Sequence, residues 1–268
     1  MSRWQGELEF ATALAERAGD LLLDRVERVE RIDYKSAKDV VTEVDHLSEA
    51  LILDAIRGAY PSDALLGEET GEHRSAKGAN PSAGDVRAWV VDPLDGTINY
   101  ANGIPFYCVS IALAEDGRPV VGVIHDPVRR ETFAAAADGP ARLGNEEIHA
   151  SDKDRLSDYV VSMSLAGRAM PSRSRALRRA IRVSRAMGSA ALSLAYVGNG
   201  RFDAFVQQGG LSAWDVAAAG LIAERAGATV TDLAGETWLD LSKKPRSLGV
   251  LAAPPALHPE LLGLIRGR

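Results

Sequence analysis

The chain has 268 residues, of which 46% are hydrophobic and 25% are charged, and its formal net charge is −6. This composition is typical of a globular protein with a large core, and the acidic balance argues against nucleic-acid binding, which depends on basic residues. Apolar runs such as residues 120–124 are far shorter than the ~20 residues of a membrane-spanning helix. Residues 1–10 lack the features of a secretory signal, and the single cysteine, Cys108, excludes an internal disulfide. We therefore expect a cytoplasmic protein with no membrane or nucleic-acid partner.

Residues 1–150 are predicted to form an α+β half. Apolar residues at helical spacing predict helices over residues 8–29 and 47–56. A short strand is expected at residues 64–66, and the Gly-, Ser-, Ala- and Pro-rich stretch 71–87 is expected to be a mobile loop. Four further strands, joined in part by a hairpin turn at 116–118, predict a largely antiparallel sheet. These strands are expected at residues 86–91, 107–114, 119–125 and 131–137.

Residues 151–268 show a different pattern, in which helical and strand-like segments alternate. Such alternation is typical of α/β structure. The expected strands are 159–163, 203–207, 228–232 and 248–252, and the expected helices are 173–183, 189–198, 214–226 and 256–266. The arginines between 173 and 185 are expected to form a solvated helix face.

The chemistry of the chain is predicted to depend on carboxylates. The sequence contains no GxxxxGK[ST] loop, no GxGxxG after a strand, no HExxH and no GxSxG. Its five histidines, at positions 46, 73, 125, 149 and 258, share no metal-ligand spacing. Acidic residues instead follow apolar runs at several points: Asp45, Glu68, Glu69, Asp92, Asp95 and Asp215.

Oxygen ligands of this kind suit hard divalent cations, Mg²⁺ above all. If these acids converge, two unit charges about 4 Å apart repel by roughly 4 kcal/mol at an effective dielectric near 20. Either the carboxyl pKa values rise or cations neutralise the charges. Bound metal ions would also offset the electrostatic repulsion between an acidic protein and a negatively charged phosphate ester.

The stretch Asp92-Pro93-Leu94-Asp95-Gly96-Thr97 is the most informative part of the sequence. Its two aspartates lie three residues apart in a turn, so both can face one small site, and Gly96 permits close backbone approach. If a helix begins at Thr97, its free N–H groups can bind phosphate. A haloacid-dehalogenase-type nucleophile is excluded, because that motif requires an aspartate at position 93, which is proline.

The chain resembles the Mg²⁺-dependent, lithium-sensitive inositol monophosphatase family. Asp92 to Asn99 matches the signature Asp-Pro-Leu/Ile-Asp-Gly-Thr-x-Asn, and Trp214 to Ala218 matches Trp-Asp-x-Ala-Ala/Gly. Three further elements occur in family order: Asp39 to Asp45, Gly67 to Glu69, and Gly188 to Leu192. The resemblance implies a layered αβαβα sandwich, with most metal ligands in residues 1–150 and with Asp215 and substrate contacts in residues 151–268. It also implies a homodimer.

The resemblance further implies two to three Mg²⁺ ions and inhibition by Li⁺. The implied metal ligands are Glu68, Asp92, the Leu94 carbonyl, Asp95 and Asp215, with Glu69 and Lys35 supporting the site. Thr97, hydrogen-bonded to Asp45, would orient an attacking water without a covalent phospho-enzyme. The residues implied in catalysis are Asp45, Glu68, Asp95 and Thr97, and those implied in substrate binding are Gly96, Thr97, Gly188, Ser189, Ala190, Gln208 and Asp215.

The sequence departs from inositol-specific members at Gln208, where those members have a glutamate that contacts the sugar hydroxyls. The expected partner is a small phosphate ester, with inositol-1-phosphate ranked first. Fructose-1,6-bisphosphate, 3′-phosphoadenosine 5′-phosphate and histidinol phosphate remain alternatives. A non-catalytic phosphate-binding or regulatory protein is a further alternative, although such a protein would have no use for a water-orienting Thr97.

Overall fold

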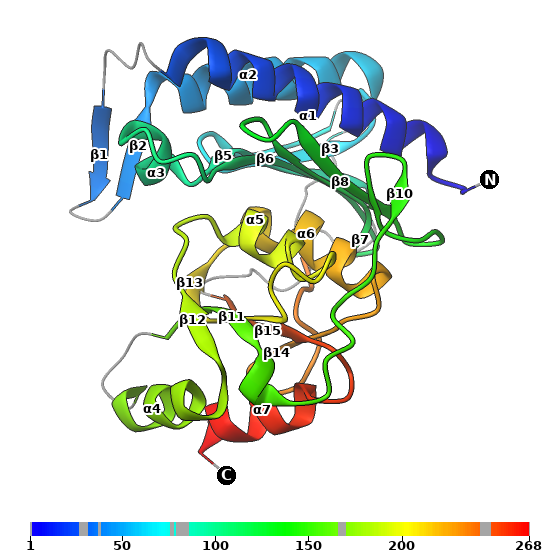
Figure 1. Cartoon of the computed structure of the whole chain (residues 1–268). Helices are drawn as coiled ribbons and strands as arrows, with labels where there is room; N and C mark the ends of the chain where they lie inside the picture. The colour runs from blue at the N-terminus through cyan, green and yellow to red at the C-terminus, as the bar shows by residue number, and fades with distance from the viewer. Residues whose placement is uncertain are drawn as a thin grey trace.

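The computed structural model describes residues 2–26, 32–36, 39–75, 78, 86–165, 170–241 and 248–267. Figure 1 shows five stacked layers in the order helix, sheet, helix, sheet, helix. Helices α1 (Gln5–Arg25) and α2 (Glu43–Ala59) form the outer layer on the first sheet. Helices α5 (Ala190–Ala195) and α6 (Ala213–Arg225) separate the two sheets, and α4 (Met170–Ala180) and α7 (His258–Arg266) cover the second. The predicted αβαβα sandwich is confirmed.

The first sheet has eight strands in the order β10-β9-β8-β7-β6-β5-β3-β4. All of its neighbouring pairs are antiparallel except β3 with β5, as the sequence largely predicted. The strands are β3 (Ala64–Gly67), β4 (Gly71–His73), β5 (Ala88–Asp95), β6 (Cys108–Glu115), β7 (Arg118–Asp126), β8 (Glu131–Ala136), β9 (Arg142–Leu143) and β10 (Glu146–Glu147).

The second sheet has five strands in the order β12-β11-β13-β15-β14. Strand β11 runs parallel to both of its neighbours, whereas β15 is antiparallel to β13 and β14. The strands are β11 (Val160–Ser164), β12 (Val183–Arg185), β13 (Ala204–Leu211), β14 (Thr229–Asp232) and β15 (Leu248–Ala253). Three smaller elements complete the described chain: the β1 (Ile32–Ser36) and β2 (Asp39–Thr42) ribbon, α3 (Thr97–Ala101), and a 3₁₀ turn at Leu156–Asp158.

Several predicted boundaries differ from the structure for identifiable reasons. Helix α2 begins at Glu43, before the predicted residue 47, because Thr42 caps it and Asp45 completes a capping box. Residues 71–73 form β4, where a loop was expected, because they pair with β3. The rest of that predicted loop lies partly outside the described residues, as do residues 27–29 of the first predicted helix. The helix predicted to reach residue 183 ends at Ala180, because residues 183–185 pair with β11 as an edge strand.

Helix α6 lies very close to the first sheet, and this contact positions its N-terminus. A Cβ on Gly122 of β7 would lie 2.6 Å from the Ala218 carbonyl oxygen, so only glycine fits there. Ser110 on β6 donates a hydrogen bond from Oγ to the Trp214 carbonyl at 3.1 Å. Because Ser110 is opposite Asp92 in the β5–β6 ladder, its bond to Trp214 places the start of α6 beside the strand that carries Asp92 and Asp95. None of the described helices combines the length and apolar character needed to cross a membrane.

Candidate metal centre and active site

Strand β5 is buried along its whole length and ends in the Asp92–Asp95 segment. The pairing with β6 shifts register between Asp92 and Asp95, which breaks the ladder at this point. Asp92 Oδ1 accepts a hydrogen bond from the Leu94 N–H at 3.0 Å, and Ser48 Oγ donates to the Pro93 carbonyl at 3.0 Å. The segment is therefore held both by its own side chain and by helix α2.

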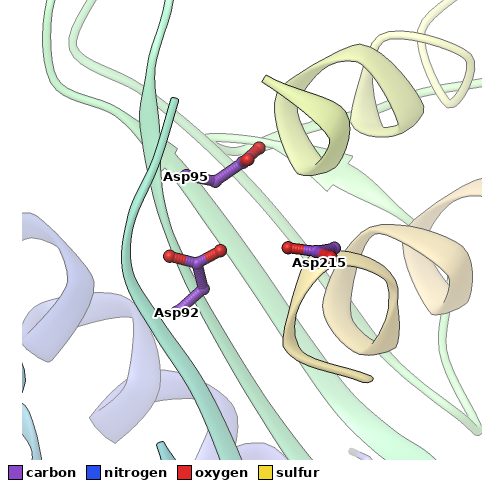
Figure 2. Close-up of side chains that lie close together, drawn as sticks. All are labelled: Asp92, Asp95 and Asp215. Carbon is purple, nitrogen blue, oxygen red and sulfur yellow. The ribbon is translucent and has the colours of Figure 1, made fainter. Parts of the chain in front are cut away.

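Three carboxylates converge beside this turn. Asp92, Asp95 and Asp215 each offer an oxygen, and these oxygens lie within 4.8 Å of one another. Figure 2 shows the three side chains pointing toward a common region, two of them from β5 and Asp215 from the first turn of α6. Asp215 also accepts a hydrogen bond on Oδ2 from the Ser212 N–H at 2.6 Å, which fixes its orientation as part of a capping box.

The electrostatics of this cluster favour a bound cation. Burial, followed by the charges of Glu68, Asp95 and Asp215, raises the pKa of Asp92 well above its ordinary value. Burial, followed by the charges of Asp95 and Glu68, also raises the pKa of Asp215 well above its ordinary value, although the hydrogen bond from the Ser212 N–H opposes the rise. Buried like charges disfavour one another's ionisation unless a cation neutralises them. Oxygen-only donors at this spacing fit a divalent ion such as Mg²⁺, and the residues present therefore fit a metal.

Asp95 is fixed by the N-terminus of α5. Its Oδ2 accepts hydrogen bonds from Ser189 Oγ at 2.5 Å and from the Ala191 N–H at 2.7 Å. Burial raises the pKa of Asp95, and these hydrogen bonds oppose that rise because they favour the ionised form. The hydroxyl of Ser189, which was expected to contact substrate, is thus directed at Asp95.

Thr97 and Asp45 form a pair across the site. Thr97 Oγ1 lies 3.0 Å from Asp45 Oδ1 and 3.1 Å from the Leu94 carbonyl oxygen. Asp45 Oδ2 accepts from both the N–H and the hydroxyl of Thr42, at 2.8 and 2.6 Å. Burial raises the pKa of Asp45, and the hydrogen bonds from Thr42 and Thr97 oppose that rise. The predicted Thr97–Asp45 contact is present in the structure, and the Leu94 carbonyl faces the same hydroxyl.

Asn99 connects the turn after β5 to the loop before α5. Its Nδ2 donates to the carbonyls of Phe106 and Met187, both at 2.7 Å. Gly188 has φ +83°, and a Cβ there would lie 2.8 Å from the Asn99 amide. Gly96 has φ +101° and directly precedes α3, so it also requires a residue that tolerates left-handed backbone. The sequence pattern identified Asn99 without indicating this bridging role.

Glu49 is a site residue that the sequence analysis missed. It is only 1% exposed, and its carboxylate accepts from the N–H groups of Glu69 and Thr70 at 2.8 and 2.9 Å and from Thr70 Oγ1 at 2.5 Å. A Cβ on Gly67 would lie 2.6 Å from Glu49 Oε2. Glu49 therefore holds the turn that carries Glu68. One signal was available: Glu49 lies four residues after Asp45, on the same face of the helix.

A cavity of about 360 Å³ opens beside the carboxylates, toward the second sheet. Of the residues predicted to bind substrate or metal, it is lined by Asp95, Gly188, Ser189, Ala190 and Asp215. Gln207 lines it, whereas Gln208 is exposed and does not. The reason is the alternation of side chains along β13, which places neighbouring residues on opposite faces.

The remaining predicted residues surround the carboxylate cluster. Glu68 follows β3, and its N–H donates to the Val91 carbonyl at 3.2 Å. This bond places Glu68 beside Asp92, whose pKa is raised in part by the negative charge of Glu68. Glu69 is half-buried, and its N–H is bound to Glu49. Lys35 lies on β1, but its side chain is outside the described part of the chain.

Comparisons with known proteins agree with this site. The model of the inositol monophosphatase family matches residues 4–267. A Nus factor SuhB of Haemophilus influenzae is 35% identical, covering 97% of this chain and 95% of its own. A fructose-1,6-bisphosphatase/inositol-1-monophosphatase of Thermotoga maritima is also 35% identical, covering 88% of each chain.

Solved structures give the same result. The crystal structure of the extragenic suppressor protein SuhB from Bartonella henselae superposes with a TM-score of 0.87 at 30% identity, covering 97% of this chain and 98% of its own. An IMPase of Thermotoga maritima superposes with a TM-score of 0.84 at 30% identity, covering 98% and 97%. The chain belongs to the inositol monophosphatase family.

Proposed function

We propose that this family phosphatase is a Mg²⁺-dependent phosphomonoesterase whose first substrate is inositol-1-phosphate, hydrolysed without a covalent intermediate. The observation that carries the proposal is the convergence of Asp92, Asp95 and Asp215, two buried carboxylates and one half-buried carboxylate from two halves of the chain, whose oxygens lie within 4.8 Å of one another. Buried carboxylates at this spacing need a cation, and metal ions offset the charge of a phosphate ester.

The residues that would hold two to three Mg²⁺ ions are Glu68, Asp92, the Leu94 carbonyl, Asp95 and Asp215. Mg²⁺ held by these residues would supply an activated water and would offset charge on the phosphoryl group and the leaving oxygen. Glu49 and Ser189 act on this site indirectly: Glu49 fixes the turn of Glu68, and Ser189 fixes the carboxylate of Asp95. Glu69 and Lys35 are proposed to support the site's charge balance.

Thr97 and Asp45 are proposed to orient the attacking water. The Thr97 hydroxyl has one proton, and its acceptors are Asp45 Oδ1 and the Leu94 carbonyl. Its oxygen can therefore accept a hydrogen bond from a water, whose lone pair is then directed away from Thr97. The N–H groups of Gly96 and Thr97, at the start of α3, are proposed to bind the phosphate.

Other substrates of the same chemistry remain within the proposal as alternatives. The Thermotoga maritima relative carries fructose-1,6-bisphosphatase in its name, and a Staphylococcus aureus structure of 25% identity and TM-score 0.80 is named for bound 2′-AMP. Histidinol phosphate and 3′-phosphoadenosine 5′-phosphate complete the set. Homodimer formation, a cytoplasmic location and inhibition by Li⁺ are further parts of the proposal that rest on the family resemblance.

A second candidate role comes from the names of several relatives. Proteins of Haemophilus influenzae and Pseudomonas aeruginosa, at 35% and 38% identity, are named Nus factor SuhB. That name does not describe a phosphatase activity, and the expectation that this chain has no nucleic-acid partner stays a prediction. Gel filtration of the protein with RNA of defined length tests it, and co-elution would contradict it.

The substrate is decided by measuring phosphate release from a panel of esters at several Mg²⁺ concentrations, with and without Li⁺. The proposal predicts Mg²⁺-dependent release, fastest with inositol-1-phosphate, and inhibition by Li⁺. Faster turnover of another ester would assign that ester as the preferred substrate and would keep the phosphatase function. Absence of Mg²⁺-dependent release from every ester would favour the non-catalytic alternative.

A further inference from the structure

Gly96, which begins the turn proposed to bind phosphate, is enclosed by two other segments of the chain. A Cβ on this glycine would lie 3.1 Å from the Phe106 carbonyl oxygen, 3.2 Å from Tyr107 Cβ and 3.3 Å from Ser189 Cβ. Phe106 and Tyr107 directly precede β6, whereas Ser189 is the N-cap of α5. Because packing this close leaves no free space, the backbone of Gly96 is fixed as long as both segments stay in place.

The first of these segments is held by Arg129, in the turn between β7 and β8. Its Nη1 donates to the Pro105 carbonyl at 3.2 Å and to Asp126 Oδ2 at 2.9 Å. The Arg129 N–H also donates to Asp126 Oδ1 at 3.1 Å, so both oxygens of this carboxylate accept from one residue. Pro105 directly precedes Phe106. The guanidinium therefore fixes the backbone one residue away from the carbonyl that faces Gly96.

Asp126 also contacts helix α5, whose N-terminal end forms the second segment. Tyr196 is the C-cap of this short helix, and its hydroxyl lies 3.5 Å from Asp126 Oδ2. The Tyr196 ring packs edge-on against Phe106, with the ring centroids 5.6 Å apart. The Asp126–Arg129 pair is therefore connected to both of the segments that enclose Gly96.

Burial makes this pair suited to hold a backbone position. Asp126 is fully buried, whereas part of the Arg129 side chain reaches the surface. A buried carboxylate needs its cationic partner, and a planar guanidinium can donate in several fixed directions at once. The carboxylate therefore keeps Arg129 in the orientation in which it also donates to Pro105. Arg130, the next residue, is exposed, and its side chain makes no hydrogen bond or ion pair with the residues that the structure describes.

We propose that Arg129 is a positioning residue for the Gly96–Thr97 turn, although it lies outside the sequence motifs of the site and does not line the cavity. By holding Pro105 it keeps the Phe106 carbonyl against Gly96, so that the two N–H groups proposed to bind phosphate keep their direction. Small displacements of such groups are costly, because binding and catalysis depend on exact geometry. The inference rests on the proposed function only for the identity of the bound group.

The test compares Arg129→Gln with the matched control Arg130→Gln. Each change removes one guanidinium from adjacent positions, so the net charge changes equally. Titration calorimetry with inorganic phosphate, at saturating Mg²⁺, measures binding to the turn without turnover. Arg129→Gln is expected to weaken phosphate binding about tenfold, the scale typical of groups that support a ligand-binding residue from behind. Arg130→Gln is expected to stay within about twofold of wild type. The affinity for Mg²⁺ alone is expected to change less than about twofold in both variants, because other contacts hold the carboxylates.

A double variant separates positioning from stability. Arg129→Gln leaves the buried Asp126 carboxylate unpaired and is therefore expected to lower Tm as well. Combining it with Asp126→Asn removes the buried charge, so most of the Tm is expected to return. The phosphate affinity is expected to stay low, because the guanidinium that donated to Pro105 is still absent. Recovery of Tm and phosphate affinity together would show that Arg129 acts on stability alone and would overturn the proposal. Unchanged phosphate binding by Arg129→Gln, or equal weakening by Arg130→Gln, would overturn it too.

Amide hydrogen exchange separates this inference from the phosphatase function. The N–H of Tyr100 donates to the Gly96 carbonyl at 3.0 Å, and that of Ile104 donates to the Asn99 carbonyl at 2.8 Å. In the double variant these two amides are expected to exchange at least about tenfold faster than in wild type, whereas amides of the β6–β7 ladder keep their rates. That result would support the inference even if wild type hydrolysed no ester and bound no phosphate. Wild-type exchange rates at Tyr100 and Ile104, or equal acceleration in the ladder, would overturn the inference while leaving the phosphatase function standing.

Discussion

Thr97 Oγ1 lies 3.0 Å from Asp45 Oδ1, and this contact joins residues 52 apart in the sequence. The other oxygen of Asp45 is occupied by the N–H and hydroxyl of Thr42 at the start of α2. The same carboxylate therefore caps a helix and orients the Thr97 hydroxyl. Its position is fixed before any substrate binds, which is how a catalytic hydroxyl is held ready for reaction.

We expect Thr97→Ala to lower kcat by about 100-fold or more, because it removes the group that orients the attacking water. Thr97→Ser keeps the hydroxyl and is expected to recover most of the rate. Steady-state phosphate release at saturating Mg²⁺ measures both variants. Near-normal turnover by Thr97→Ala would show that the hydroxyl has no part in the reaction.

In the absence of metal, electrostatic repulsion between Asp92 and the neighbouring carboxylates is expected to lower the stability of the folded protein. Because the pKa of this carboxyl is raised in the folded state, the folded protein binds its proton more tightly than the unfolded chain does, and stability falls as pH rises through the folded pKa. In EDTA at pH 8, Asp92→Asn removes the unfavourable charge and is expected to raise Tm by about 2 °C or more. The gain should shrink as the pH is lowered, because Asp92 is then protonated in the wild type.

Thermal unfolding of both proteins, in EDTA and in saturating Mg²⁺, tests this expectation. Mg²⁺ is expected to raise the Tm of wild type more than that of the variant, since the variant has lost a ligand. A variant that is less stable than wild type in EDTA at pH 8 would contradict the assigned repulsion.

Glu49→Gln is expected to weaken Mg²⁺ binding about tenfold, the scale typical of changes behind the metal ligands. Glu49 contacts the backbone of the Glu68–Thr70 turn, so the substitution loosens the turn without removing a ligand. Asp54→Asn is the matched control, because it removes one negative charge from an exposed position on the same helix. Isothermal titration with Mg²⁺ measures both, and equal effects would indicate that only net charge matters.

His125 is expected to contribute to loss of stability in mild acid. It is buried, its Nδ1 lies 2.9 Å from Thr132 Oγ1, and its ring packs against Gly19. Burial lowers the pKa of His125 from 6.5, although Glu16, Asp20 and Asp126 act in the opposite direction. Below pH 6.5 the unfolded chain therefore takes up a proton that the folded protein resists, so stability decreases as the pH falls.

Urea unfolding at pH 7.5 and 5.5, with saturating Mg²⁺, measures this effect. His125→Gln is expected to be less stable than wild type at both pH values, because the ring packing is lost. Its stability is nevertheless expected to change less between the two pH values. An equal change in both proteins would remove His125 from the acid response.

The helices, the strands and the candidate carboxylates were predictable because their signals are local, whereas the layered arrangement was implied by the family resemblance. The hydrophobic period marked α1 and α6, and the Asp-Gly pair at 116–117, both with positive φ, marked the hairpin. The convergence of Asp92 with Asp215 was predicted only from the family resemblance. Local patterns cannot predict it, because it depends on how closely α6 approaches β7 at Gly122.

The features that were missed depend on tertiary contacts. Glu49 resembles any helix acid in sequence, and its role appears only when the turn of Glu69 and Thr70 folds against it. Strand β12 is three residues long and exists through its pairing with β11. Gln207 and Gln208 are identical in type, and only the strand register distinguishes them.

Phosphate release from inositol-1-phosphate, followed against Mg²⁺ concentration for wild type and Asp95→Asn side by side, tests the central claim most directly. We predict no release by wild type in EDTA, a rate that rises and saturates with Mg²⁺, and a kcat at least about 100-fold lower for Asp95→Asn. Release that persists in EDTA, or near-wild-type turnover by Asp95→Asn, would contradict a catalytic metal centre built on these carboxylates.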